Sequence, residues 1–199
     1  MDRDKFFKDA LEFVKEKHKG QVRAGNVPAW HHLARVSGLL SFVLEKHGEC
    51  GGQERSIIVT AALGHDVLED TKVTEKEVMA VFGPRGSEII KSMTNKWGDK
   101  NVMPYVKQVA GSEEAVRLVK LSDLYDNHIS VVYNLHILGL KWTHSYFLPI
   151  VTPMRLAVTK TKFKKFKKTA EELVSLVNSA AFLLDGEIRR FEEKNKKRP

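Results

Sequence analysis

Apolar residues recur at helical spacing along nearly the whole chain, and no run of alternating apolar and polar residues marks a pair of strands. This periodicity predicts an all-α fold in which amphipathic helices pack into a bundle. Gly139 is expected to end one helical stretch, and a kink or break is expected at Pro149 and Pro153. The segments expected to be helical are 6–20, 31–47, 55–69, 74–82, 85–94, 112–132, 142–158 and 170–193, and residues 97–103 are expected to form a loop.

The length of 199 residues favours one compact domain. We expect residues 1–199 to form that unit, with a motif-bearing core over about 5–135 and a helical C-terminal extension over 142–194. No apolar run approaches the roughly 20 residues that cross a bilayer, and the charged start lacks the apolar stretch of a secretory signal. A cytoplasmic protein without a membrane partner is therefore expected, and the single Cys50 agrees with a reducing compartment.

The net charge of +8 predicts a surface that attracts anions at neutral pH, and nucleotides and nucleic acids both qualify. Much of the excess lies in two lysine-rich runs, Lys160–Lys168 and Lys194–Arg198. Such runs are more often solvated helix faces or frayed tails than binding sites. We therefore do not expect nucleic acid as a partner.

A group of ionisable residues ends the most apolar of the expected helices. His65, Asp66, Glu69 and Asp70 follow the run IIVTAALG. On a helix, His65 lies one turn before Glu69 and Asp66 lies one turn before Asp70, so all four can face a shared cleft. An imidazole nitrogen and a carboxylate oxygen are suitable ligands for a divalent cation. Taken alone, the segment fits a polar helix end exposed to water equally well.

A second polar row strengthens the cleft interpretation. Lys120, Asp123, Asn127 and Ser130 are spaced three, four and three apart, so a helix presents them as one stripe while its other faces are apolar. The stripe either lines a polar cleft or is solvated on a surface helix. Asp126 lies off the stripe, beside Asn127, and is an alternative metal ligand on this helix.

These residues occur in a recognisable order along the chain. His32, the His65-Asp66 pair and Asp123 follow one another as H…HD…D, which resembles the HD superfamily of metal-dependent phosphohydrolases. The longer element HDVLEDT, which starts at His65, looks like the HDxxEDT of the RelA/SpoT-type alarmone hydrolases. KLSDLYDN, which starts at Lys120, is similar to their KLADxxxN. The resemblance implies an HD-domain helical bundle, in agreement with the all-α prediction.

The resemblance spans about residues 5–135, and it also separates two neighbouring histidines. In the family, the first ligand histidine follows an arginine by nine positions, with a proline between them. Arg23 and Pro28 place His32, and not His31, in that register.

The chain departs from the family pattern around this first histidine. The family usually has Arg-Lys, Pro-Tyr and His-Pro pairs there. The differing residues are Ala24 after Arg23, Ala29 after Pro28 and Leu33 after His32. These changes spare the metal ligands but remove a basic and an aromatic group near the expected nucleotide base.

The family's roles, carried onto the matching positions, imply a complete site that holds one divalent cation, Mn²⁺. The implied metal ligands are His32, His65, Asp66 and Asp123. The implied catalytic carboxylates are Glu69, the preferred base, and Asp70. The implied substrate contacts are Arg23 at the nucleotide base, Lys120 at a phosphate, and Asn127 and Ser130 at the sugar or phosphate.

The resemblance therefore implies an enzyme that hydrolyses the 3′-pyrophosphate of the guanosine nucleotide (p)ppGpp to GDP or GTP and pyrophosphate. A phosphohydrolase that acts on a 2′- or 3′-phosphorylated cofactor or a nucleoside monophosphate is the alternative within the enzyme class. A non-catalytic module that senses a nucleotide is the alternative outside it. The presence of both Glu69 and Asp70 argues against the sensor, because a binding module needs no water-activating pair beside a metal.

Overall fold

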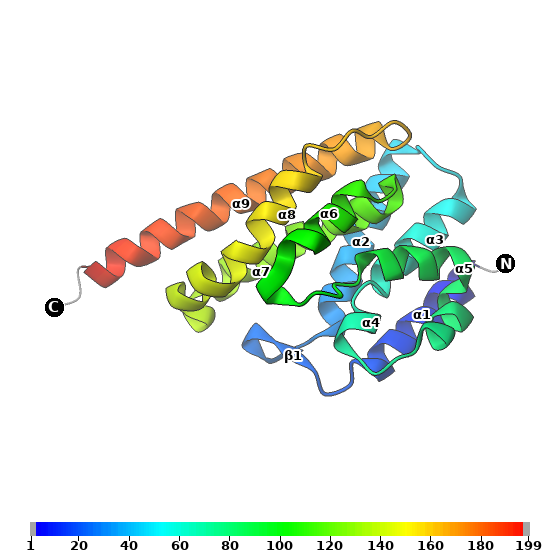
Figure 1. Ribbon diagram of the computed structural model, residues 1–199, viewed down its shortest axis with the longest axis horizontal. Helices are drawn as coiled ribbons and strands as arrows, with labels where there is room; N and C mark the ends of the chain where they lie inside the picture. The colour runs from blue at the N-terminus through cyan, green and yellow to red at the C-terminus, as the bar shows by residue number, and fades with distance from the viewer. Residues whose placement is uncertain (1–2, 197–199) are drawn as a thin grey trace.

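The structure, a computed structural model, describes residues 3–196 and has the expected all-α architecture (Figure 1). The α-helices are α1 (Arg3–Lys17), α2 (Trp30–His47), α3 (Gly52–Leu63), α4 (Val67–Asp70), α5 (Glu75–Met93), α6 (Val102–Gly111), α7 (Glu114–Trp142), α8 (Leu148–Val158) and α9 (Lys167–Lys196). None of these helices is long and apolar enough to cross a membrane.

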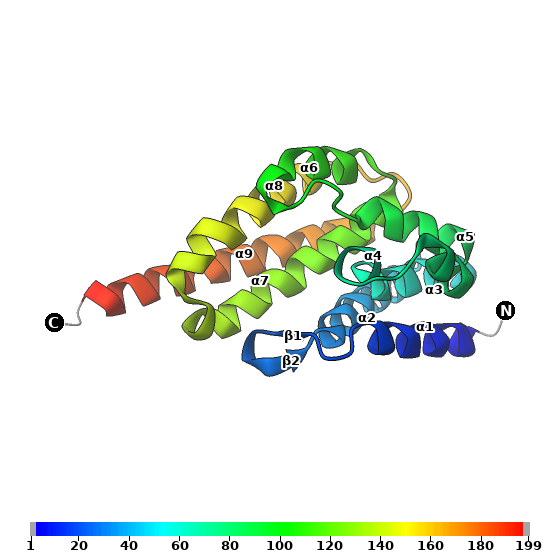
Figure 2. The same cartoon turned by 60° about the horizontal axis from the view of Figure 1, so that its bottom comes forward.

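The helices form two groups that meet at α2 and α7. In Figure 1, α7, α8 and α9 run side by side towards the C-terminal end, and α1, α3, α4 and α5 gather at the other end. α9 packs along α7, and α2 lies against both α3 and α7. Figure 2 shows a small hairpin, β1 (Val22–Arg23) and β2 (Val27–Pro28), along one edge of the molecule, where it contacts α2 and the turn of the hairpin contacts α7.

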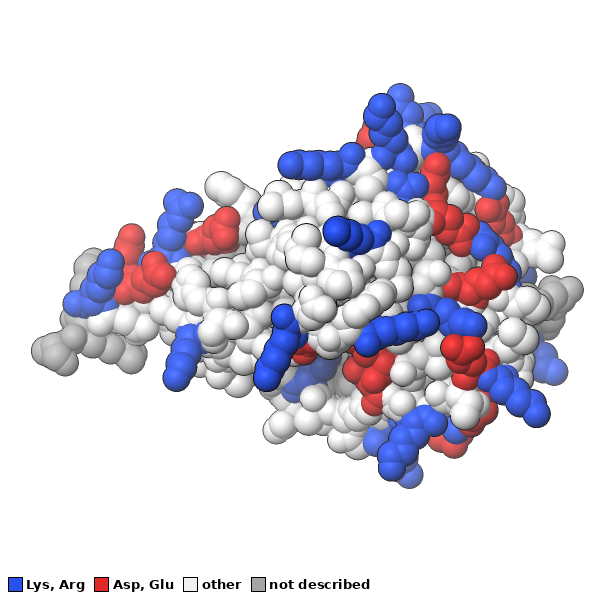
Figure 3. Space-filling view, viewed as in Figure 1, with Lys and Arg blue, Asp and Glu red and all other residues white. Residues whose placement is uncertain are grey.

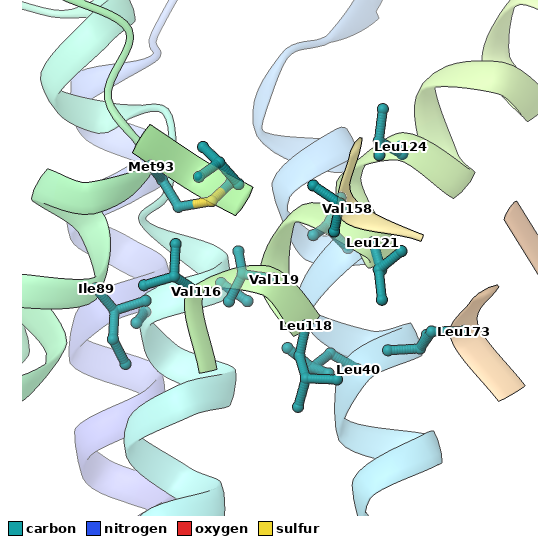
Figure 4. Packing of buried hydrophobic residues seen from close by; sticks show 14 of the residues in the cluster. Leu40, Ile89, Met93, Val116, Leu118, Val119, Leu121, Leu124, Val158 and Leu173 are labelled. Atoms are coloured by element: carbon teal, nitrogen blue, oxygen red, sulfur yellow. The ribbon is translucent and has the colours of Figure 1, made fainter. Parts of the chain in front are cut away.

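Buried apolar side chains surround the first half of α7. Leu118 is fully buried and lies towards Leu40 of α2 and Leu173 of α9, whereas Val116 lies on the side of Ile89 of α5 (Figure 4). Apolar residues therefore occupy several faces of α7, as expected for a helix at the centre of a bundle. The polar stripe that α7 also carries is held in place by this packing.

The helix expected over 55–69 is interrupted in the structure, and this corrects the sequence-based boundary. α3 ends at Leu63, and α4 begins at Val67 after a turn. Gly64 packs closely against α5 at this turn, where a Cβ atom would lie 2.5 Å from Phe82 Cζ and 2.9 Å from Ile90 Cδ1. The turn brings the chain past α5 and reorients the residues that follow.

The capping box expected at Thr74 is present at the start of α5. Thr74 Oγ1 accepts a hydrogen bond from the backbone N–H of Glu77 at 3.3 Å, and Glu77 Oε2 accepts one from the backbone N–H of Thr74 at 2.8 Å. Gly83 has φ +69°, so the helical path is broken at the expected Gly83-Pro84 position. The two helices expected over 74–82 and 85–94 are therefore the two parts of α5.

Two short elements were not expected from the sequence. The strands of the hairpin have two residues each, which is too short to show an alternating pattern, and Gly25 turns the chain between them with φ +75°. α6 begins inside the expected 97–103 loop, after a 3₁₀ turn at Asp99–Asn101. Pro104 lies in its first turn, where the missing N–H is not needed.

The helical path is interrupted at Gly139, as expected, and α8 begins before Pro149 and Pro153. Gly139, with φ +77°, interrupts α7, and a π-helical turn at Thr143–Phe147 precedes α8. Pro149 is in the first turn of α8 and Pro153 lies inside that helix. The change of direction therefore precedes both prolines.

The lysine-rich run Lys160–Lys168 forms the connection into α9. Lys165 Nζ pairs with Glu54 at 2.6 Å, and the carboxylate of Glu114 accepts backbone hydrogen bonds from residues 164–166. Acidic side chains lie among the basic ones over the face shown in Figure 3. The second run, Lys194–Arg198, extends beyond the described residues.

Candidate metal centre and adjoining cavity

His65 lies in the turn between α3 and α4, with its side chain only 1% exposed. Its Nδ1 is 2.8 Å from the backbone oxygen of Ala62. A carbonyl oxygen only accepts hydrogen bonds, so Nδ1 carries the hydrogen. In the neutral imidazole, Nε2 is therefore the nitrogen with the free lone pair, and this buried atom has no hydrogen-bond partner. The helix break after Leu63 produces this orientation, with Nε2 available to a cation.

His32 lies near the start of α2 and is oriented in a comparable way by a charged group. Its Nδ1 donates to Asp126 Oδ2 at 2.7 Å, and Arg35 also donates to Asp126, at 2.6 and 2.9 Å. Burial raises the pKa of Asp126, but the hydrogen bonds from His32 and Arg35 outweigh it and lower that pKa. Nε2 of His32 is buried and has no hydrogen-bond partner. Asp126, considered as a rival ligand, thus lies behind His32.

The two free imidazole nitrogens converge with two carboxylates. His32 Nε2 is 3.2 Å from Asp123 Oδ1, and His65 Nε2 is 3.5 Å from the same oxygen. Asp66 lies on the other side, with Oδ1 3.1 Å from His65 Nε2 and Oδ2 3.8 Å from His32 Nε2. One ligand atom each from His32, His65 and Asp66 all lie within 4.8 Å of one another. The neighbouring His31 instead packs against Trp30, with ring centroids 4.1 Å apart.

This donor set fits a divalent cation. Burial lowers the pKa of His65, but the charges of Asp66 and Asp123 outweigh it and raise that pKa to about 10. Burial raises the pKa of Asp66, but His65 outweighs it and lowers that pKa to about 2. The cluster therefore attracts positive charge strongly, and a cation that binds there replaces a proton on the imidazole. Mixed nitrogen and oxygen ligands suit several first-row metals.

Lys120 is directed at the cluster itself. Its Nζ lies 2.9 Å from Asp123 Oδ2 and 3.2 Å from the hydroxyl of Tyr105. Burial lowers the pKa of Lys120, but Asp123 and Tyr105 outweigh it and raise that pKa. Lys120 is therefore charged, and it fixes one oxygen of Asp123 while the other faces the histidines. The expected contact of Lys120 with a phosphate stays a prediction.

Glu69 and Asp70 lie on α4, beyond the turn that carries His65. Both side chains are exposed, yet enough protein surrounds them that desolvation raises their pKa values, with the charge of Asp66 adding to the rise. The pKa of Glu69 reaches about 7 even though its Oε2 accepts a hydrogen bond from the backbone N–H of Asn95 at 2.8 Å. A carboxylate with such a pKa can accept a proton near neutral pH.

The remaining residues of the α7 stripe lead from the cluster into a cavity of about 770 Å³. Asn127 Nδ2 donates to Asp123 Oδ1 at 2.6 Å, and its Oδ1 accepts a hydrogen bond from Arg23 on β1. Arg23, Asn127 and Ser130 all line the cavity, together with aromatic side chains that include Tyr125 and Trp142. Two of the four stripe residues, Asn127 and Ser130, thus line a cavity with largely apolar walls, whereas Lys120 and Asp123 do not line it.

Sequence reasoning missed several side chains that hold this arrangement together. Tyr105 and Asn95 each contact a residue of the expected site, and Arg35 contacts Asp126 behind His32. Helical spacing could have indicated Arg35, which follows His32 by three positions and therefore shares its face of α2. No comparable signal marks Asn95, because its contact with Glu69 joins residues 26 positions apart through the backbone.

Comparison with known proteins supports the family resemblance that the sequence motifs indicate. No protein-family model matches this chain. The chain is 36% identical over 124 residues to a guanosine-3′,5′-bis(diphosphate) 3′-pyrophosphohydrolase of Aquifex aeolicus, covering 59% of this chain and 16% of the relative. It is 30% identical over 129 residues to the guanosine-3′,5′-bis(diphosphate) 3′-pyrophosphohydrolase MESH1 of Drosophila melanogaster, covering 61% of this chain and 66% of the relative.

A solved structure supports the fold independently. It is that of a metazoan SpoT orthologue described as hydrolysing ppGpp, and it matches with a TM-score of 0.62 at 22% sequence identity. The match covers 84% of this chain and 93% of the other. The predicted resemblance to the alarmone hydrolases is confirmed. This resemblance extends to the helical fold. The aligned region covers 16% of the Aquifex aeolicus relative and 66% of the Drosophila melanogaster relative.

Proposed function

We propose that this chain is a metal-dependent phosphohydrolase that removes the 3′-pyrophosphate of (p)ppGpp, giving GDP or GTP and pyrophosphate. The observation that carries the proposal is the pair of buried, unpartnered Nε2 atoms of His32 and His65. They converge with two carboxylates beside a cavity large enough for a nucleotide. The names of the relatives support the choice of substrate.

In this proposal, His32, His65, Asp66 and Asp123 hold one divalent cation, and Mn²⁺ is the metal that the family resemblance implies. Such a cation, when bound, lowers the pKa of a water molecule and offsets the charge of the attacked phosphoryl group. Asp126 keeps His32 in the tautomer that leaves Nε2 free, and the carbonyl of Ala62 does the same for His65.

Glu69 acts as the general base and Asp70 assists it. The raised pKa of Glu69, about 7, makes this carboxylate a stronger base than an ordinary surface glutamate. It accepts the proton of the attacking water while the hydrogen bond from the Asn95 backbone holds its other side. Asp70 lies beside it on α4 and helps to orient the water.

The nucleotide lies in the cavity next to the cluster. Arg23 contacts the base, and Asn127 and Ser130 offer hydrogen bonds to the sugar or a phosphate. Lys120 stabilises the charge of Asp123, and the family resemblance implies that it also contacts a phosphate. The aromatic walls of the cavity, including Trp142 and Tyr125, provide the apolar surroundings that a purine ring requires.

One observation favours a second candidate, a phosphohydrolase for a less highly charged nucleotide. The formal charges of the residues that line the cavity cancel, because it is lined by Arg23 and Arg35 and also by Asp99 and Asp126. Ala24, which also lines the cavity, stands where the family usually has a lysine. A substrate with a single terminal phosphate, such as a 2′- or 3′-phosphorylated cofactor, needs fewer cations there than ppGpp does.

A product analysis separates these candidates. The purified chain is incubated with Mn²⁺ and ppGpp, pppGpp, NADPH or common nucleotides, and released pyrophosphate and phosphate are measured separately. The proposal predicts pyrophosphate from ppGpp, and its loss in the Asp123→Ala variant. Release of phosphate alone from another nucleotide would establish the second candidate, and tight nucleotide binding without turnover would establish a sensor.

A further inference from the structure

A buried histidine outside the metal cluster has no role in the mechanism above. His18 follows the C-terminal end of α1, is only 2% exposed, and lies within hydrogen-bond distance of Gln21, with Nδ1 2.7 Å from Gln21 Oε1. An amide oxygen only accepts hydrogen bonds, so Nδ1 of His18 carries the hydrogen and donates it. Its Nε2 is buried without a hydrogen-bond partner.

The bond from His18 fixes the orientation of the Gln21 amide. With Oε1 facing the imidazole, the NH₂ group faces α4, where Nε2 donates to the backbone oxygen of Asp70 at 2.8 Å. A flipped amide would place two acceptors, Oε1 and the Asp70 oxygen, against each other. The backbone oxygen of Gln21 also accepts a hydrogen bond from Ala29 at 2.9 Å, which closes the base of the hairpin.

These contacts join the hairpin to α4. α4 has only four residues, so it cannot hold its own conformation, and the backbone oxygen of Asp70 at its end needs a donor from outside the helix. Gln21 supplies that donor. Gln21 also lies two residues before Arg23, so one side chain ties the hairpin that carries Arg23 to the segment that carries Glu69 and Asp70.

We propose that His18 and Gln21 are positioning residues that hold Glu69 and Asp70 in register with Arg23 for the reaction. This inference rests on the proposed hydrolase function. His18 acts through its Nδ1 hydrogen and the Gln21 amide, and neither side chain touches the substrate. Its Nε2 plays no part in the reaction.

Substitutions that keep one ring nitrogen at a time test this assignment. In His18→Asn, the amide nitrogen replaces Nδ1 and can still donate to Gln21, so kcat should stay within about threefold of wild type. In His18→Gln, the amide nitrogen replaces Nε2 instead, and in His18→Leu both nitrogens are lost. Both of these variants, and Gln21→Met, should lower kcat by roughly 10–100-fold, the range for a lost supporting hydrogen bond at such a site.

Two further measurements separate positioning from general damage. Metal content and KM should change less than about threefold in all four variants, because neither His18 nor Gln21 contacts the proposed ligands and Arg23 keeps its hydrogen bond to Asn127. The control is His47→Leu, which removes a partly buried histidine at the C-terminal end of α2, paired with Glu172 at 2.7 Å, and should leave kcat unchanged. A fall in metal content equal to the fall in kcat would overturn the assignment.

Nuclear magnetic resonance of the Gln21 side-chain amide provides a readout that does not depend on activity. The amide proton bound to Asp70 should be protected from exchange in wild type and His18→Asn, and unprotected in His18→Leu. If wild type fails to hydrolyse ppGpp, the proposed function fails while this readout still decides whether His18 orients Gln21. The positioning inference is wrong if the amide stays protected in His18→Leu, or if His18→Gln is active and His18→Asn is not.

Discussion

The two histidines of the candidate metal centre depend on different partners for the same orientation. A backbone carbonyl holds His65, and no single substitution removes it. A carboxylate holds His32, and that carboxylate also binds Arg35. The orientation of His32 can therefore be tested by mutation, whereas that of His65 depends on the path of the main chain.

Replacing Asp126 should weaken metal binding without removing a ligand. In Asp126→Asn, the amide oxygen can still accept a hydrogen bond from His32. The variant loses the negative charge that makes Nε2 of His32 a stronger metal ligand. Metal affinity should fall roughly 10–100-fold, as for other partners of metal-bound histidines. Isothermal titration with Mn²⁺ measures this, with Asp185→Asn on the exposed side of α9 as the matched control. Equal affinities for the two variants would show that Asp126 does not support His32.

The adjacent histidines provide a second test. His31→Ala should have little effect on metal content, because His31 packs against Trp30 and stays outside the cluster. His32→Ala should abolish metal content and activity, because it removes one of the two free imidazole nitrogens. Elemental analysis of the two purified variants decides the matter, and the reverse order would mean that the register with Arg23 is wrong.

Glu69 should be recognisable from the pH dependence of turnover. A general base works when it is deprotonated, so kcat/KM should rise with pH through an inflection at about pH 7. The positive charge of a bound cation would move this inflection to a lower pH. Glu69→Gln should lower kcat by roughly 10²–10⁴ and remove that inflection, while metal and substrate still bind. Turnover close to wild type would leave Asp70 or the metal alone to activate the water.

At the level of elements, the break between α3 and α4 determines where the ionisable residues point. In a continuous helix over 55–69, His65 would lie one turn after Ala61, on the same buried face of the helix. The turn at Gly64 instead places its Nδ1 on the carbonyl of Ala62 and its Nε2 in the cluster. At that turn, Gly64 packs so closely on Phe82 and Ile90 that no larger residue fits.

Gly64→Ala should therefore be destabilising. The added Cβ would lie within 3 Å of both Phe82 and Ile90, which forces the core to shift at a cost of about 1–3 kcal/mol. Thermal or urea unfolding measures the loss, and metal affinity should fall with it because His65 is the next residue. The control Gly38→Ala meets nothing within 4 Å on α2 and should be neutral or stabilising. Similar stabilities of the two variants would contradict this account of the break.

Much of the element order could be predicted because amphipathic periodicity, the Thr74 capping box and the glycine breaks are local signals. The end of α3 could not, because Gly64 is tolerated in a helix and its close approach to Phe82 and Ile90 appears only in the folded chain. The hairpin at 22–28 is too short for its pattern to be visible. Tertiary packing, which a single helix pattern does not contain, decided both features.

At the level of the whole molecule, the site is assembled from segments that are far apart in the chain. His32 and Asp126 are 94 positions apart, and Arg23 and Asn127 are 104 apart. The candidate ligands could be predicted because their types and order match a known pattern. The supporting contacts of Asp126, Gln21 and Asn95 could not, since each depends on the approach of a distant segment.

The central claim is that one divalent cation lies between His32, His65, Asp66 and Asp123. Crystals grown with Mn²⁺ and diffraction data collected on both sides of the manganese absorption edge test it most directly. The account predicts one anomalous peak within bonding distance of both Nε2 atoms and of an oxygen from each aspartate. A peak elsewhere, or none at Mn²⁺ concentrations that support hydrolysis of ppGpp, would contradict it.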